Sequence, residues 1–346
     1  VRFFGDVPLI LDLKTVEDSK GPRDSKELIY DQIIEDLTFA EEHLPLRSEY
    51  SASDEGRINK GAAKILFGKV YLTKGDFQKA KDKLAEVVEH ESEYGFGLHK
   101  DYHANWLRDT EAGIEAVLYI EYKEPPFQHN GEMALAGPKY SIPGSLGISA
   151  LNEADIPTQE LYDQFDNRDL RKKTNFKTEF AHLKTGEILK SSIPLSGKFW
   201  VEGLETGDRC DVNMHIIRYA DAILMYAEAL NEVGKSTKAL AMLNRIRERA
   251  FGDDSGNFKP MSKDEFRTAI LNERRLEFPH EGHRWFDLVR TGTFIQRMKE
   301  HSAYEAKVAE ANKTEIAQNI KEHMILMPIP QSEIDLNPNL VQNAGY

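Results

Sequence analysis

Apolar side chains recur at steps of three and four residues near both ends of the chain, which is the pattern of helices that bury one face. Apolar positions between residues 28 and 40 follow Asp24 and Glu27, which have the spacing of a capping box, and the pattern stops near Pro45. A second run of this kind, over residues 262–276, opens on the same spacing. Both patterns predict helices.

A repeat of the tetratricopeptide kind occurs twice along the chain. The first copy contains Gly68, Tyr71, Gly75, Ala80 and Leu84, and the second contains Ala227, Leu230, Gly234, Ala239 and Leu243. In both copies the first small residue lies seven residues before the glycine and twelve before the alanine. Glycine can end a helix in the left-handed conformation, and alanine lets the next helix pack back closely. Each copy therefore predicts an antiparallel helix pair.

The helical periodicity is lost between about residues 100 and 210. Prolines interrupt this stretch, which is rich in glycine, asparagine and aromatic residues: Pro125, Pro126, Pro138, Pro143, Pro157 and Pro194. A long stretch in which loops dominate is uncommon unless it is functional, because binding residues tend to lie on loops that a rigid frame holds. We expect the ligand site there.

These patterns predict an α-class fold with tetratricopeptide-like helix pairs and a loop-rich ligand-binding insertion. The whole chain, 1–346, is predicted to be a single domain. Residues 1–100 would form a helical scaffold with one helix pair, and residues 101–204 the loop-rich binding segment. Residues 205–346 would form a helical scaffold with the second pair.

The charge balance argues against a nucleic-acid partner. The 346 residues include 58 acidic and 45 basic side chains, for a formal net charge of −13. Binding to a phosphate backbone requires a basic surface, which this composition does not supply.

The chain has no apolar run of about 18 residues, so we expect no membrane-spanning helix. Its first residues lack the basic and apolar regions of a signal peptide, and we expect that processing or truncation has removed the true start. The single cysteine, Cys210, cannot form an internal disulfide.

Three carboxylates at four-residue steps, Glu273, Glu277 and Glu281, could be read as an acid–base pair of a hydrolase. Arginines are interleaved with them and can form ion pairs with these acids: Arg274, Arg275, Arg284 and Arg290. We therefore favour a structural role, a helix end held by buried ion pairs, and predict no catalytic residue.

The sequence contains no metal, phosphate-binding or hydrolase motif of the HExxH, CxxC, GxxxxGK[ST] or GxSxG type. His99, Asp101, His103 and Asp109 lie near one another, but solvated loop residues account for this spacing better than a metal site does. We predict no metal and no cofactor.

Several phrases in the second half resemble the SusD/RagB family of outer-membrane nutrient-binding lipoproteins of Bacteroidetes. They are RYADAILMYAEA (218–229), NRIR (244–247), NERRLEF (272–278), EGHRWFDLVR (281–290), MPIPQSEID (327–335), NPNL (337–340) and QN (342–343). The motif residues within them are Arg218, Asp221, Glu228, Glu273, Arg274, Glu281, Gly282, Arg284 and Trp285. Residues 3–9, 157–163 and 169–171 resemble further landmarks, so the likeness covers nearly the whole chain.

The resemblance implies a non-catalytic protein that captures a glycan at the cell surface and delivers it to a partner TonB-dependent, SusC-like transporter. It also implies an outer-membrane location through an N-terminal lipid anchor that this chain does not contain. Cys210 lies deep inside the chain and is not that anchor.

Sugar recognition uses flat aromatic faces that stack on pyranose rings and planar polar groups that bind hydroxyls. Trp285 belongs to the EGHRWFDLVR motif, to which we assign a structural role. The candidates for sugar contacts are therefore the aromatic and amide residues of the irregular stretch. The predicted ligand-binding residues are Trp106, Trp200, Tyr140, Tyr102, Phe199, Asn105 and Asn130, with Phe127, Gln128 and Asn152 nearby. For each aromatic residue, packing in the core is the alternative. A few such stacks predict micromolar to millimolar affinity, which suits capture of a polymer.

Three other functions stay open. A peptide-binding member of the same family would respond to oligopeptides and not to glycans. A tetratricopeptide-type scaffold would bind another protein through its helical face. A hydrolase would turn over a polysaccharide and lose that activity when one carboxylate is replaced.

Overall fold

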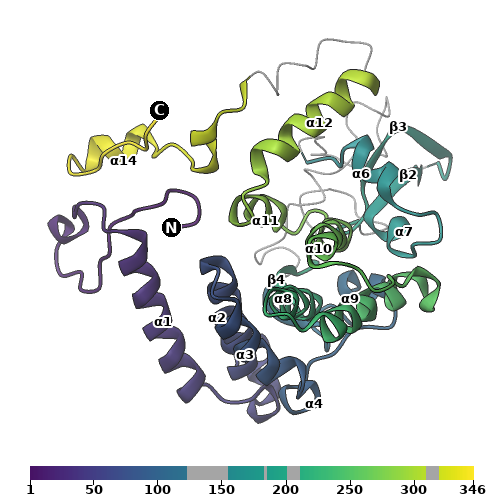
Figure 1. Cartoon of the computed structure of the whole chain (residues 1–346), viewed down its shortest axis with the longest axis horizontal. Helices are drawn as coiled ribbons and strands as arrows, with labels where there is room; N and C mark the ends of the chain where they lie inside the picture. Colours follow the sequence, from purple (N-terminus) through teal and green to yellow (C-terminus); the bar gives the residue numbers. More distant parts are fainter. Residues whose placement is uncertain (123–154, 183–184, 201–210, 309–318) are drawn as a thin grey trace. The chain divides into compact units, whose positions relative to one another are not determined.

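The computed structural model describes residues 1–122, 155–182, 185–200, 211–308 and 319–346. Helices dominate these residues, which confirms the predicted α class (Figure 1). The chain forms two compact units. One comprises Val1–Glu42 and Trp285–Tyr346, and the other comprises His43–Arg284. Among the described residues, no helix combines the length and the apolar character needed to cross a bilayer.

Both predicted helix pairs are present in the unit formed by His43–Arg284. The first pair is α2 (Lys60–Lys74) with α3 (Phe77–Val88), and the second is α8 (Tyr219–Glu232) with α9 (Ser236–Phe251). Gly75 follows α2 with φ +78°, and Gly234 follows α8 with φ +77°. These are left-handed conformations that glycine adopts without strain, which is why each helix ends there.

Helix α8 is the centre of this unit. Its residues from Tyr219 to Asn231 are all buried, because α2, α3, α9 and α10 (Lys263–Glu277) pack around it (Figure 1). Helix α10 begins as predicted, with Ser262 and Glu265 in a capping box. The tetratricopeptide-like pairs therefore supply a rigid helical frame.

A close approach of α2 and α3 explains the glycine at position 68. A Cβ atom built on Gly68 would lie 2.5 Å from Cγ of Leu84, so the two helices meet where no side chain fits. Ala80 and Leu84, which the repeat predicted to lie at this contact, are both fully buried.

We expect Gly68→Ala to lower the free energy of unfolding by about 1–3 kcal/mol, because the added methyl group overpacks this contact. Gly21→Ala is the control, since a Cβ at Gly21 meets nothing within 4 Å. Urea unfolding curves check the expectation. Equal midpoints for the two variants would contradict it.

The segment predicted to be rich in loops also contains short helices and strands among its described residues. Its elements are η4 (Tyr102–Trp106), β1 (Ala116–Ile120), α6 (Gln159–Gln164), α7 (Arg171–Asn175), β2 (Phe176–Ala181) and β3 (Ile188–Ser196). Strand β3 alternates exposed and half-buried side chains over its first residues, which is the period-two pattern of a strand.

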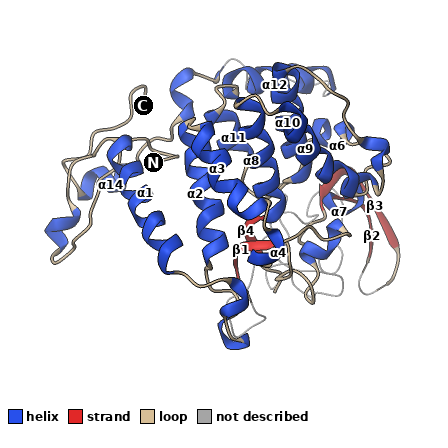
Figure 2. Cartoon of the chain, turned by 60° about the horizontal axis from the view of Figure 1, so that its bottom comes forward, coloured by secondary structure: helices blue, strands red, loops and turns tan. Residues whose placement is uncertain are grey.

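The strands form two separate antiparallel pairs (Figure 2). Strand β1 pairs with β4 (Met214–Arg218), with Ala116 opposite Arg218. Strand β2 pairs with β3, with Phe176 opposite Ser196. The first pair places Arg218 at the start of α8, next to the loop that precedes β1. Short helices complete this unit: η2 (Arg47–Glu49), η3 (Ala52–Asp54), α4 (Glu91–Tyr94) and η5 (Asp254–Gly256).

The other unit joins the two ends of the chain. Its elements are η1 (Val16–Ser19), α1 (Lys26–His43), α11 (Arg284–Arg290), α12 (Phe294–Val308), η6 (Glu322–Ile325) and α14 (Gln331–Leu336). The guanidinium of Arg23 donates to the carbonyls of Phe4 and Val341 and to Oδ1 of Asn343. Asn343 belongs to the QN phrase, so this phrase has a structural role.

The cap of α1 differs from the predicted one. The hydroxyl of Ser25, not the carboxylate of Asp24, accepts from an N–H group of the first turn, that of Leu28 at 3.3 Å. The carboxylate of Asp24 instead accepts from the backbone N–H of Leu9 at 2.8 Å. A contact with a distant segment has replaced the local one.

Candidate functional site

Charged side chains are buried where η4, α7, β4, α9 and α10 meet, and we call them the buried charge network. Its members are Glu115, Asp169, Arg171, Lys198, Arg218, Arg249, Glu273, Glu277 and Glu281. Removing so many charges from water is unfavourable unless each finds a partner of opposite charge with good geometry. The distances show that each does.

Glu277, at the end of α10, lies at the centre of the network. Its carboxylate is 2.9 Å from the guanidinium of Arg171, 3.0 Å from that of Arg218 and 2.6 Å from that of Arg249. Burial alone would raise the pKa of this carboxyl, but the three guanidinium charges outweigh burial and hold the pKa far below its ordinary value. Glu277 therefore stays ionised.

Glu281 lies beside it and pairs with Lys198 and with Nε of Arg218, the latter at 2.7 Å. Burial raises the pKa of Glu281, and the charges of Arg218 and Lys198 more than offset that effect, so the pKa falls to about 2. Glu281 is ionised at any physiological pH.

Three more acids complete the pairing. Asp169 contacts Arg171 at 2.7 Å. Glu115 contacts Arg218 at 2.5 Å and Arg249 at 3.1 Å. Glu273 contacts Arg171 and Arg247, each at 2.7 Å. The network therefore joins α7, β4, α9 and α10 to the loop before β1.

The predicted ion pairing of these acids is confirmed, but the predicted partners are wrong. Arg274 contacts Asp221 at 2.7 Å, Arg275 contacts Glu160 at 3.0 Å, Arg290 contacts Asp287 at 2.9 Å, and Arg284 donates to the carbonyl of Leu271. The true partners come from segments distant in sequence, which local spacing cannot reveal. One signal existed: Asp169 and Arg171 belong to the 169–171 landmark.

The remaining motif residues are also held by contacts within the protein or by the backbone conformation. Asp221 is buried between Lys69, at 2.8 Å, and Arg274. Gly282 has φ +72°, a conformation that other residues rarely adopt. The ring of Trp285 lies 4.5 Å from that of Phe294, and Glu228 is buried on α8.

An aromatic cluster lies against the network. Its members are Tyr102, Trp106, Phe180, Leu195, Phe199 and Val212. The hydroxyl of Tyr102 donates to the carbonyl of Glu277 at 2.7 Å. Nζ of Lys198 lies 4.6 Å from the centre of the Trp106 ring, a cation–π contact. The buried charge network and the aromatic cluster therefore pack directly against each other.

This packing decides the position of four predicted ligand-binding residues. Trp106 is 4% exposed, and Tyr102, Phe199 and Asn105 are as deeply buried. The structure brings them together, but neighbouring side chains cover them, so they present no free face to a ligand. Their position is that of the core-packing alternative.

Trp200 is the predicted residue that remains accessible. It is half-buried beside the cluster, with its ring 4.7 Å from that of Phe180 and 6.0 Å from Nζ of Lys177. Tyr140 and Asn130 lie outside the described residues, as do Phe127, Gln128, Asn152 and Cys210.

The structure groups no three His, Cys, Asp or Glu side chains around a possible metal ion within its described residues. Asp101 caps η4 by accepting from the backbone N–H of His103.

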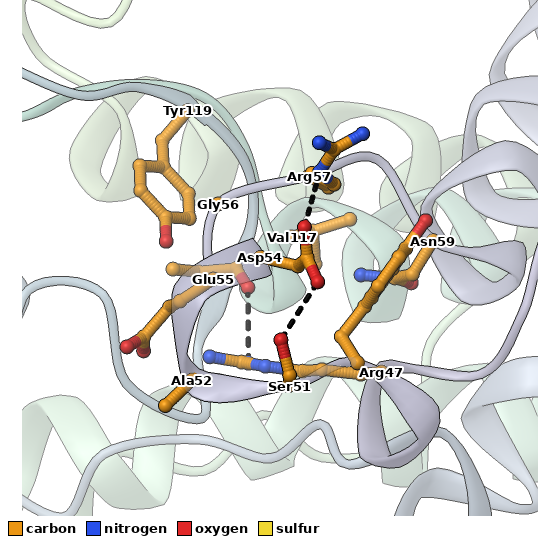
Figure 3. A pocket seen from close by; sticks show the side chains of 12 residues that line it. Arg47, Ser51, Ala52, Asp54, Glu55, Gly56, Arg57, Asn59, Val117 and Tyr119 are labelled. Carbon is orange, nitrogen blue, oxygen red and sulfur yellow. Dashed lines mark hydrogen bonds and ion pairs between the residues drawn. The ribbon is translucent and has the colours of Figure 1, made fainter.

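A polar pocket that the sequence did not reveal lies between η2, η3, the start of α2 and β1 (Figure 3). We call it the Tyr119 pocket, a cavity of about 190 Å³ lined by Arg47, Tyr50, Ser51, Ala52, Asp54, Glu55, Gly56, Arg57, Asn59, Ala116, Val117 and Tyr119. Most of these residues lie in the segment predicted to be scaffold. The run Ser51-Ala52-Ser53-Asp54-Glu55-Gly56, which is rich in turn-forming residues, is the signal that could have indicated it.

The model of the SusD family matches residues 197–346. SusD-like protein P2 of Formosa agariphila is 30% identical over 385 aligned positions, which cover the whole of this chain and 71% of that protein. The chain belongs to the SusD family.

Two solved structures of this family show the same fold over the whole chain. A SusD superfamily protein from Parabacteroides distasonis has a TM-score of 0.80 at 27% identity and is covered over 75% of its length. A laminarin-binding SusD-like protein has a TM-score of 0.78 at 26% identity, also with 75% of its length covered. The predicted SusD/RagB resemblance is confirmed. The family phrases account for much of the buried charge network, since Arg218, Glu273, Glu277 and Glu281 all lie within them.

Proposed function

We propose that this chain is a non-catalytic glycan-binding protein that captures oligosaccharides or polysaccharides at the cell surface. It delivers them to a SusC-like TonB-dependent transporter and is held at the outer membrane by an N-terminal lipid anchor. The observation that carries the proposal is the likeness in fold and sequence, over the whole chain, to a relative that binds laminarin.

The state of Glu277 and Glu281 argues against an acid–base role for these two carboxylates. An acid–base pair needs one carboxyl group that can donate a proton near neutral pH. Glu277 and Glu281 are instead buried in ion pairs that lower their pKa values, in the case of Glu281 to about 2. Neither can act as a general acid, so we assign these residues to stabilisation of the helical frame.

Trp200 is the predicted contact that can stack on a sugar ring, because its face is not fully covered. A stack of this kind contributes about 0.5–1.5 kcal/mol, so we expect Trp200→Ala to weaken glycan binding by about two- to tenfold. Trp200→Phe keeps a flat face and should retain most of the affinity. Isothermal titration with laminarin as the first glycan measures both.

Trp106→Ala serves as the contrast, because this side chain lies in the aromatic cluster. Its removal should lower the melting temperature, whereas Trp200→Ala should leave it nearly unchanged. Trp200→Ala with the affinity of the wild type would remove Trp200 from the site.

A further inference from the structure

The Tyr119 pocket is held in shape by its own hydrogen bonds. The guanidinium of Arg47 donates to the carbonyls of Gly113 and Ala112 at 2.9 and 2.6 Å, which fixes η2 against the turn before β1. The hydroxyl of Tyr50 donates to the carbonyl of Ile58 at 2.8 Å and closes the loop between them. The cavity is therefore preformed, which lowers the entropy cost of filling it.

A buried amide group points into this cavity. Asn59 is 5% exposed, and its Oδ1 caps α2 by accepting from the backbone N–H of Ala62 at 3.1 Å. The cap fixes the side chain, so that its Nδ2 end is directed into the pocket (Figure 3). No group among the described residues accepts from this NH₂, so the donor is available to a ligand.

A tyrosine hydroxyl lies on the opposite wall. Tyr119 extends from β1, and its hydroxyl lies on the same side of the pocket as Glu55 (Figure 3). Burial raises the pKa of Tyr119, so the hydroxyl stays protonated and can donate as well as accept. Within the described residues it has no hydrogen-bond partner. The phenol ring adds a flat apolar surface.

The charges at the rim disfavour an anion. The guanidinium of Arg47 donates to backbone carbonyls, and Nε of Arg57 pairs with the carboxylate of Asp54 at 2.9 Å. Glu55 is exposed, and Oε2 of Glu121 would lie 3.5 Å from a Cβ placed on Gly56. A carboxylate or sulfate in the pocket would meet these acids, whereas neutral hydroxyls can donate to them.

We propose that the Tyr119 pocket binds one neutral sugar residue of the captured glycan. The ring lies against Tyr119, its hydroxyls accept from the amide of Asn59 and donate to Glu55, and a uronic acid or sulfated residue is rejected. This inference rests on the proposed glycan-binding function and names the class of sugar at a position apart from Trp200.

Saturation-transfer NMR on the whole chain tests the pocket directly. The probes are the methyl glycosides of glucose, galactose, mannose and xylose, with methyl glucuronide as the charged probe. Asn59→Asp keeps the helix cap, because aspartate caps as well as asparagine does, but removes the donor and adds a negative charge. Tyr119→Phe removes the hydroxyl alone, and Tyr162→Phe, on α6, is the matched control.

We expect at least one neutral glycoside to show transfer and methyl glucuronide to show none. Asn59→Asp and Tyr119→Phe should each lower the affinity for the neutral glycoside by about three- to tenfold. Tyr162→Phe should leave this affinity unchanged. Three results would overturn the inference. They are no transfer to any neutral glycoside, transfer to methyl glucuronide equal to that to a neutral glycoside, and wild-type affinity for the neutral glycoside in both pocket variants.

The same variants separate this inference from the proposed function. If laminarin binding depends on Trp200 while both pocket variants keep wild-type affinity for the glycosides, the pocket inference fails and the proposed function stands. If the pocket variants lose affinity for a neutral glycoside but no polysaccharide binds the wild type, the pocket inference stands and the proposed function fails.

Discussion

Replacing Glu277 with glutamine should lower the free energy of unfolding by about 3–5 kcal/mol, because it leaves buried guanidinium charges without their partner. Arg171, Arg218 and Arg249 all contact this carboxylate and are almost fully buried. Glutamine has nearly the same shape, so the loss reports charge and not packing. The fold should persist at low temperature, with a lower unfolding midpoint.

Glu17→Gln is the control for this experiment. Glu17 pairs with Lys20 at 2.8 Å, but its side chain is exposed, and such surface pairs contribute about 0–1 kcal/mol. Urea unfolding followed by tryptophan fluorescence compares the two variants. A loss of stability in Glu277→Gln no larger than in Glu17→Gln would show that the network does not hold this unit together.

Acidification from pH 4.5 to pH 2 should remove about 3 kcal/mol of stability through Glu281 alone. Its pKa is about 2 in the folded chain, against an ordinary value of 4.5. The ionised form is therefore favoured by folding, so the stabilisation is complete above pH 4.5 and is lost as the pH falls toward 2. Asp221, whose pKa is also lowered, adds to the same trend.

Unfolding curves at a series of pH values between 5 and 2 measure this effect, with Glu281→Gln as the comparison. The variant lacks the titrating group, so the difference in stability between it and the wild type should shrink as the pH falls. Parallel pH profiles for the two proteins would contradict the assigned ion pairs.

The helical frame could be predicted because its signals are local. Gly75 and Gly234 end helices, and Ala80 and Ala239 mark close packing, so the spacing alone located both pairs. The strand pairs were missed because each strand is short and β1 lies almost a hundred residues from its partner, β4. Period-two patterns of this length are weak beside proline-rich loops.

The site was harder to predict because burial depends on contacts between distant segments. Trp106 was a reasonable sugar contact by residue type, but Lys198 and Arg218 cover its ring. Asn59 gave no sequence signal beyond that of a helix cap. That its NH₂ group faces a pocket depends on β1, which is distant in the sequence.

Titration of the whole chain with neutral polysaccharides, starting with laminarin, and with a matched peptide panel tests the central claim most directly. Melting temperature and tryptophan fluorescence are the readouts, because a ligand that binds only the folded state raises the melting temperature. The account predicts a saturable rise with at least one glycan and none with peptides. A rise with peptides and none with any glycan would contradict it.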